Sequence, residues 1–396
     1  MKNISLHEKI SHTFTVNTHS HHLEDNFFTD FTLSKLLKQT YVDWCGVTFE
    51  DTLKSRELYL NKVKYKSYYI WVIKAIKEIY NMKDDLTAET WDNYSDKIEQ
   101  THKQDKGWHK KILRDVCKYE NILLDAYWNP GSDNNDASLF NPVFRVNPLF
   151  FGYSKDSYDH NGLNTYNLYD REFENIDEYL KYVKELIIKK KDEGCVALKI
   201  PIAYDRDLDF KNISKQKASI VFEFKNYYEK DVINFQDYLC FEICALAADI
   251  DIPVQIHTGM GQLNKTAPIN LLKLIRENPN TKFVLFHGGF PWTSDTLGLL
   301  HLFPNVYSDI CWLPILSPTS AIETLHKLIE VSTSDKIFWG CDTWTSEESY
   351  GSRLSFNYVL EKTLTSKIQD GYFSKIYAEE IVDNISFRNA KKLYKL

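Results

Sequence analysis

The chain has 396 residues, of which 43% are apolar and 26% charged, and its formal net charge is -7. This is the composition of an ordinary folded globular protein, and the mildly acidic balance gives no basic surface for nucleic acid or an anionic membrane. The apolar runs are far shorter than the roughly 20 residues of a membrane-spanning helix, and the first residues lack the apolar core of a secretory signal. We therefore expect no nucleic-acid or membrane partner, and leave a homo-oligomer open.

Eight short apolar runs alternate with amphipathic segments along the chain. Each run is rich in Val, Ile, Phe or Leu, as is typical of strands buried on both faces of a parallel sheet. The runs are Thr13–Val16, Ile122–Tyr127, Val143–Val146, Val196–Ile200, Val254–His257, Phe283–His287, Val306–Ile310 and Ile337–Cys341. Helical spacing of apolar residues predicts helices over Asp177–Lys191, Phe235–Ala248, Ile269–Arg276 and Ser320–Val331. The alternation predicts an α/β fold, a (β/α)8 TIM barrel, built as a single domain over residues 1–396.

Residues from about 50 to 118 interrupt this alternation. They are rich in Lys and Tyr, carry Trp71, Trp91 and Trp108, and have helical patterns throughout. We interpret them as a helical insertion after the first strand unit. Such an insertion could cap an active site or form a packing subdomain, and the sequence leaves both open.

Seven cysteines are spread along the chain, and no two form a C-x-x-C pair. The odd number and the lack of such a pair indicate reduced thiols. Reduced thiols are typical of a reducing compartment, so we expect a cytoplasmic protein.

The first apolar run is followed by His19 and His21. In an extended strand, residues two apart point to the same side, so both imidazoles can reach one metal ion. An H-x-H pair is a weak signal by itself, because most histidines after apolar runs are core or surface residues. Whether the pair indicates a metal site depends on which residues end the other predicted strands.

Four further polar residues lie at the same end of predicted strands. His257, His287 and Asp342 end three runs, and Lys199 lies near the end of another. Taken alone, Asp342 would be explained as a helix N-cap, and Lys199 would be explained as an ordinary charged residue at the edge of the barrel. Their joint placement at the end of a barrel where catalytic groups collect favours a metal centre. Imidazoles with a carboxylate are ligands for zinc, manganese or iron rather than calcium or magnesium.

These residues stand in segments that resemble the amidohydrolase superfamily, in its amidohydrolase-related (amidohydrolase 2-type) branch. The resemblance is nearest to the metal-dependent hydrolase domain that is fused, in some proteins, ahead of a glutamine-synthetase-like module. It covers most of the chain apart from the insertion. The resembling segments are residues 17–21, 197–204, 252–259, 285–291, 305–309 and 340–342, with a tail at Ile385–Tyr394 that resembles the closing helix of the family.

The resemblance implies a distorted TIM barrel with a divalent metal centre of one or two ions, zinc first, with manganese or iron as alternatives. It implies that His19, His21 and His257 are metal ligands. Asp342 would be both a ligand and the catalytic proton shuttle. His287 would bind a second metal or position the substrate in catalysis. Lys199 stands where many members carry a lysine that is carboxylated by CO2 and bridges two metals.

Two positions depart from the family pattern. Asn17 stands where the family has Asp, which could change how the metal-binding histidines are oriented. Asp205 separates Tyr204 from Arg206, where close relatives place Arg directly after Tyr. We still expect Arg206 to bind a substrate carboxylate.

The rim of the site is predicted from aromatic residues that follow strands. Tyr204, Trp128, Trp312 and Trp344 could contact an apolar or aromatic part of a substrate. The alternative is that some aromatic residues fall near any site in a chain that is 14% aromatic.

The resemblance favours a metal-dependent hydrolase that uses activated water on a small amide, ester or lactone. The alternative on the same fold is a metal-dependent decarboxylase or an enzyme like uronate isomerase. A carboxylated Lys199 with two metals favours hydrolysis, whereas one metal with a free lysine favours decarboxylation or isomerisation. A non-catalytic scaffold is the third reading, and only Asn17 hints at it.

Overall fold

The computed structural model describes residues 5–224 and 226–396 and contains one sheet of eight parallel strands. The strands follow one another around the sheet in chain order, each hydrogen-bonded to the next. They are β1 Thr15–Ser20, β2 Tyr119–Leu124, β3 Phe140–Arg145, β4 Ala197–Ile200, β5 Val254–Ile256, β6 Phe283–Leu285, β7 Val306–Asp309 and β8 Ile337–Phe338. This nearly closed parallel sheet, with helices around it, confirms the predicted α/β TIM barrel.

Each predicted apolar run overlaps one of these strands. The run at Thr13–Val16 places the first strand too early, because β1 continues to Ser20 and includes His19. All six residues of β1 are buried although most are polar, so an apolar pattern could not reveal its full length.

Backbone hydrogen bonds bring the first strand against the end of the last. These bonds join β1 to the segment at and after the end of β8, and each side supplies donors. Thr18 N donates to Trp339 O at 3.3 Å, Asp342 N donates to His19 O at 2.8 Å, and His21 N donates to Thr343 O at 2.9 Å. This contact between β1 and the end of β8 therefore places two expected metal ligands, His19 and Asp342, side by side although they come from opposite ends of the chain.

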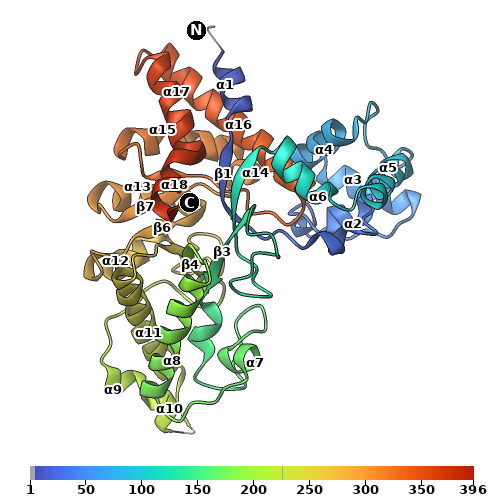
Figure 1. Ribbon diagram of the computed structural model, residues 1–396. Helices are drawn as coiled ribbons and strands as arrows, with labels where there is room; N and C mark the ends of the chain where they lie inside the picture. The colour runs from blue at the N-terminus through green and yellow to red at the C-terminus, as the bar shows by residue number, and fades with distance from the viewer. Residues whose placement is uncertain (1–4, 225) are drawn as a thin grey trace.

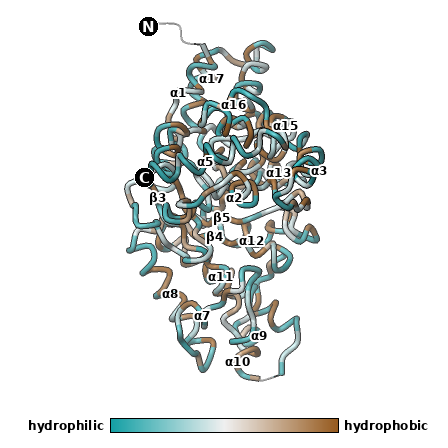
Figure 2. Tube along the Cα trace, turned by 90° about the vertical axis from the view of Figure 1, so that its right-hand side faces the viewer, coloured by the Kyte–Doolittle hydropathy of each residue, from teal (hydrophilic) through white to brown (hydrophobic). Residues whose placement is uncertain are grey.

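Helices pack around the strands, and the four predicted ones are present. They are α8 Ile176–Asp192, α11 Glu229–Asp249, the 3-10 turn η6 Pro268–Leu271 continuing into α12 Leu272–Glu277, and α15 Pro318–Val331. Figure 2 shows strands β3, β4 and β5 in the middle of the molecule, with helices above and below them. The remaining elements after β2 are η4 Asn147–Phe151, α7 Thr165–Tyr169, η5 Ile202–Tyr204, α9 Lys215–Ala218, α10 Ile220–Glu223, η7 Phe286–Gly289, α13 Thr293–Leu302, α14 Leu313–Leu316, α16 Ser346–Gln369, α17 Lys375–Asp383, η8 Asn384–Arg388 and α18 Asn389–Tyr394.

The chain between β1 and β2 is helical and gathers on one side of the strands, in blue to cyan in Figure 1. It has a hydrophobic cluster of its own that includes Phe31, Tyr59 and Trp91. Helical turns begin before the predicted start near residue 50. The elements are η1 Asp25–Phe28, α2 Leu33–Lys38, η2 Asp43–Cys45, α3 Leu53–Val63, α4 Ser67–Tyr80, α5 Trp91–Gln104, α6 Trp108–Lys111 and η3 Ile112–Val116, while α1 Leu6–His12 precedes β1.

All seven cysteines are free thiols, as the sequence predicts. Within the described residues, no helix is both long enough and apolar enough to cross a membrane.

The predicted helix near residue 177 offers a small stability test. Asn175 caps α8, and its Oδ1 accepts a hydrogen bond from Glu178 N at 3.0 Å. Asn175→Ala should lower the free energy of unfolding by about 1 kcal/mol, because an amide donor at the helix start loses its partner. Urea unfolding measures this. Lys181→Ala, on an exposed part of the same helix, is the control and should change little; an unchanged Asn175→Ala variant would contradict the cap.

Candidate metal centre

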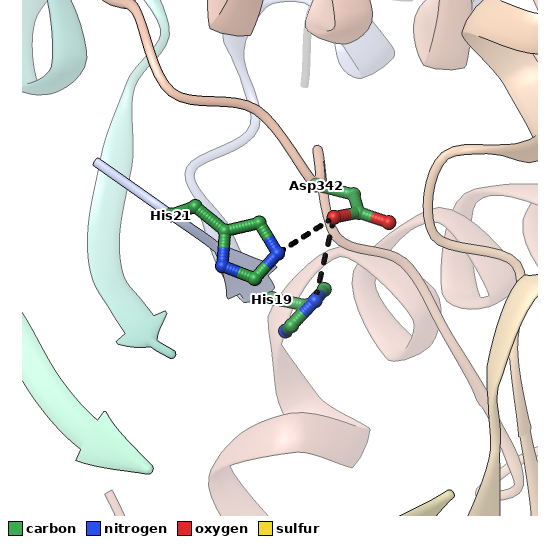
Figure 3. A group of neighbouring side chains, drawn as sticks. All are labelled: His19, His21 and Asp342. Carbon is green, nitrogen blue, oxygen red and sulfur yellow. Dashed lines mark ion pairs between the residues drawn. The ribbon is translucent and has the colours of Figure 1, made fainter. Parts of the chain in front are cut away.

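Three expected ligand side chains meet at the carboxyl ends of β1 and β8. His19 Nε2 lies 3.4 Å and His21 Nε2 lies 3.2 Å from Asp342 Oδ1. Figure 3 shows both imidazoles turned toward this oxygen. One ligand atom from each residue falls within 4.8 Å of the others, and all three side chains are buried. The geometry is that of a candidate site for one cation.

The hydrogen bonds of His21 fix which of its nitrogens carries the proton. Its Nδ1 lies 2.7 Å from the backbone carbonyl of Asp125. A carbonyl only accepts, so Nδ1–H donates, and the neutral ring turns its Nε2 lone pair toward the carboxylate. A lone pair facing a carboxylate oxygen needs a cation between them, either a proton or a metal. A backbone carbonyl that orients a ligating imidazole is a common feature of metal sites.

The charges of the group favour the metal-binding forms of its members. Burial, together with the charge of Lys199, lowers the pKa of His19 to about 3. Although burial opposes ionisation, the neighbouring His19 and His21 hold the pKa of Asp342 well below its usual value. Neutral imidazoles and an ionised carboxylate are the forms that ligate a metal.

His287 and His257 form a second pair next to this group. His257 Nε2 lies against the backbone carbonyl of Met260, and His257 Nδ1 shares a hydrogen bond with His287 Nε2, 2.9 Å away. His287 Nδ1 lies 3.2 Å from the backbone carbonyl of Cys311, 3.4 Å from the Cys311 thiol and 3.7 Å from Asp342 Oδ2. Burial lowers the pKa of His287 to about 4, so the ring is neutral. Both ring nitrogens of His257 are thus engaged, by His287 and Met260, and its role as a metal ligand beside His19 and His21 stays a prediction.

The backbone at the strand ends is unusual where the site is built. Asp342 has a φ of 58°, His287 of 63° and Trp312 of 63°. Residues with side chains rarely adopt this left-handed region, and such strain is concentrated at functional sites. Three of the loops that follow strands therefore hold these side chains in strained conformations.

The donor set fits a divalent cation. Two buried imidazole nitrogens and one carboxylate oxygen converge, and Nδ1 of His19 has no hydrogen-bond partner among the described residues. Three protein ligands with room for water are typical of a catalytic zinc site. A second group, of His287, Cys311 and Asp342, meets the same distance criterion. Burial raises the pKa of the Cys311 thiol well above its usual value, so this second set is the weaker one.

A cavity of about 280 Å³ opens over the candidate site. This is near the lower end of the range for small-molecule pockets, about 300–1,000 Å³. The side chains that line it, among the described residues, are His19, His21, Tyr41, Trp44, Tyr127, Arg145, His160, Asn161, Lys199, Pro201, Tyr204, His257, Asp342 and Trp344. Larger hollows exist elsewhere on the surface, but they contain none of the converging groups described above.

The expected substrate residues divide into two sets. Tyr204 and Trp344 line the cavity, and the Tyr204 ring packs 4.5 Å from His257. Trp312 packs against His287 at 5.3 Å without lining the cavity, and Trp128 contacts Tyr127 from outside it.

Arg206 lies away from the cavity in an ion-pair network. Its guanidinium is 2.9 Å from Asp237 and 3.3 Å from Asp207. The structure thus places Arg206 in this network and not among the described residues that line the cavity.

The departure at Asn17 also has a structural explanation. Asn17 Oδ1 accepts from Cys341 N at 2.9 Å, and its Nδ2 donates to the Cys341 sulfur at 2.9 Å. The amide thus ties β1 to the residue before Asp342. An amide can both donate and accept here, whereas a carboxylate could only accept.

The sequence reasoning missed several residues in and around the cavity. Arg145 ends β3 and Asp125 directly follows β2, so the rule that found Lys199 could have found them. Tyr41 and Trp44 come from the helical segment between β1 and β2, and His160 from the loop after η4. Nothing in the local sequence of these last three shows that they reach the barrel mouth.

Comparisons with known proteins agree with the fold. Residues 222–396 match the sequence model of the amidohydrolase family. Protein fluG of Emericella nidulans is 31% identical over 150 residues, a segment that spans 36% of this chain and 17% of that protein.

Solved structures of similar shape are distant in sequence. A chain of Lactobacillus casei described as a metal-dependent hydrolase has a TM-score of 0.72 at 16% identity, covering 98% of this chain and 97% of its own. Glucuronate isomerase of Caulobacter crescentus has a TM-score of 0.77 at 14% identity, covering 98% and 93%. The matched residues 222–396 contain His257, His287 and Asp342 at the ends of β5, β6 and β8. Residues 222–396 thus match the amidohydrolase family and form part of a nearly closed TIM barrel, as the resemblance of the chain to that superfamily predicts.

Proposed function

We propose that this chain is a metal-dependent hydrolase that cleaves a small amide, ester or lactone. The observation that carries the proposal is the group of His19, His21 and Asp342, whose lone pairs face one another in a buried site at the barrel mouth. Metal-dependent hydrolysis needs such a group together with a small cavity, and both occur here.

These three residues would hold one divalent cation, zinc first and manganese or iron as alternatives. When bound, the cation would supply Lewis acidity that lowers the pKa of water toward neutrality. A single ion is favoured over two because His257 is engaged by His287 and Met260. Lys199 stays a free amine in this proposal, because its Nζ lies over the Phe286 ring, 3.4 Å from the ring centre.

In the proposal Asp342 is also the residue that transfers a proton. Its Oδ1 faces the two histidines, while its Oδ2 faces His287 Nδ1 at 3.7 Å. One oxygen is therefore engaged at the metal group, and the other is available to take a proton from attacking water and return it to the leaving group. His287, held beside His257, would position the substrate oxygen.

An aldose–ketose isomerase is the second candidate. A whole-chain likeness in fold to glucuronate isomerase favours it, and a free Lys199 beside a single ion would favour it too. In that reaction, Asp342 and His287 would move a proton between adjacent substrate carbons without net uptake of water.

The experiment compares zinc-loaded and chelator-treated protein on N-acyl amino acids, lactones, carboxylic esters and hexuronates. The proposal expects hydrolysis of one of the first three classes with zinc only, detected as acid release in a pH-stat for lactones and esters and as free amine for N-acyl amino acids. Conversion of a hexuronate to its keto form without acid release would replace the hydrolase by the isomerase. Turnover that survives complete removal of metal would contradict both.

A further inference from the structure

Two buried basic side chains stand side by side in the wall of the cavity. Arg145 is the last residue of β3, and Lys199 lies opposite it in β4 as its register partner. They are 5% and 1% exposed, and both line the cavity. Neighbouring strands are about 4.8 Å apart, so two cations here repel each other unless anions separate them.

One carboxylate is bonded to this pair. Arg145 Nη1 donates to Asp125 Oδ2 at 2.7 Å. The two side chains form a buried ion pair at this distance. Asp125 pairs with Arg145, whereas the charges of Asp342 and Asp309 act on Lys199 without either carboxylate accepting a hydrogen bond from its Nζ.

His160 holds the guanidinium in place without adding a charge. Its Nδ1 donates to Asp205 Oδ2 at 2.9 Å, so its Nε2 accepts from Arg145 Nη2 at 3.0 Å. Asn147 Nδ2 donates to the same Asp205 oxygen at 2.9 Å and fixes the carboxylate. The guanidinium is thus oriented before any ligand arrives, which lowers the ordering cost of binding.

Hydrogen-bonding capacity remains at both cations. Over the described part of the chain, neither Lys199 Nζ nor Arg145 Nε has a hydrogen-bond partner. The Lys199 amine instead lies over the face of Phe286. A buried ammonium without an acceptor is strongly unfavourable, and an anion in the cavity would relieve this.

We propose that Arg145 and Lys199 form a subsite for a substrate carboxylate, so that the enzyme acts on a small organic acid. This rests on the proposed function, because it takes the cavity over His19, His21 and Asp342 as the substrate site. The carboxylate binds the cations of β3 and β4, and the bond to be cleaved faces the metal group across the same cavity. Tyr41, Tyr204 and Trp344 form an apolar wall for the rest of the molecule, while Trp44, 60% exposed, stands at its edge.

In this subsite Lys199 acts as a positively charged amine, whereas a carboxylated Lys199 would be negatively charged. A carbamate forms when the amine nitrogen attacks CO2 and loses a proton, and the product carries a negative charge. Such a group would repel a substrate carboxylate instead of attracting it. The two roles of Lys199 therefore exclude each other and can be separated by experiment.

The test uses benzoate and benzamide, which have the same shape but differ in charge. Both are titrated calorimetrically into chelator-treated full-length protein at pH 7 in CO2-free buffer, so that no metal can bind the probe. We expect benzoate to bind at least tenfold more tightly than benzamide. Lys199→Met and Arg145→Lys should each remove most of this preference, the second by losing the planar fork of donors.

The control is Lys336→Met, which replaces another largely buried lysine, one that bonds the carbonyl of Phe303 outside the cavity. It should bind benzoate as the wild type does. Equal affinity for benzoate and benzamide, or an unchanged preference in Lys199→Met, would overturn the subsite. A CO2 adduct on purified wild type that is missing from Lys199→Met would also overturn it. Because no metal is present, these results stand apart from success or failure of the hydrolase.

Discussion

Asp342→Asn should lower the turnover of the zinc-loaded enzyme by about a thousandfold, within the 10²–10⁴ range of general acid–base catalysis. The amide oxygen can still face the two histidines, so part of the metal affinity should remain. The amide nitrogen cannot accept a proton, however, so the transfer at Oδ2 is lost. The measurement pairs kcat, on the ester, amide or lactone that the wild type cleaves, with metal content per chain.

Asp335→Asn is the matched control, because this half-exposed carboxylate pairs with Lys392 at 3.1 Å outside the cavity. It should keep wild-type kcat. An Asp342→Asn enzyme with full activity and full metal would contradict the proton-transfer role. Loss of activity together with all of the metal would leave Asp342 as a ligand alone, and would also contradict that role.

Lys199→Met should raise the free energy of unfolding of chelator-treated protein by about 3 kcal/mol at pH 7. Burial lowers the pKa of Lys199 from 10.5 to about 8, so the folded state binds its proton less tightly than the unfolded state does. Below pH 8 both states are protonated, and the folded wild type carries the whole cost of the buried ammonium. Methionine has a similar length and no charge.

The sign of the pH dependence follows from the same pKa difference. Between pH 8 and 10.5 the unfolded chain holds a proton that the folded chain has released, so wild-type stability gains with rising pH relative to the variant. The advantage of Lys199→Met should therefore be full below pH 8 and vanish toward pH 10.5. Urea unfolding at several pH values in CO2-free buffer measures it. A variant less stable than wild type at pH 7 would show that Lys199 already has a counter-ion.

The barrel could be predicted because its strands are buried on both faces. Such strands read as continuous apolar runs, and those at Val254–His257 and Phe283–His287 lie directly over β5 and β6. The exception was β1, whose polar residues are buried through hydrogen bonds: Thr18 donates to Asp309, and Asn17 pairs with Cys341. Hydropathy alone cannot show burial of that kind.

The site was predicted where it depends on strand ends and missed where it depends on packing. His19, His21, Lys199 and Asp342 line the cavity because strand ends point into the barrel mouth. Tyr41 lines it because the backbone N–H of Tyr41 donates to the buried Glu348 at 2.6 Å, a contact across 307 positions. No local sequence pattern predicts a contact between residues so far apart in the chain.

Arg206 shows the opposite failure. Its place after Tyr204 suggested a substrate contact, but the chain turns it toward Asp237 on α11. Arg145 occupies the cavity instead, and its only sequence signal was its position at the end of a strand. An arginine near a strand end thus needs the tertiary structure to decide between substrate and structural roles.

The most direct test of the metal centre is metal content per chain by elemental analysis, on protein grown with zinc or manganese, with intact mass recorded from neutral buffer. His21→Asn is the test variant, and His301→Asn, an exposed histidine outside the cavity, is its control. We expect about one metal in wild type and His301→Asn, a loss of at least tenfold in metal affinity for His21→Asn, and no added mass of CO2. Metal-free wild type under every condition, or equal metal in His21→Asn, would contradict a metal centre at His19, His21 and Asp342.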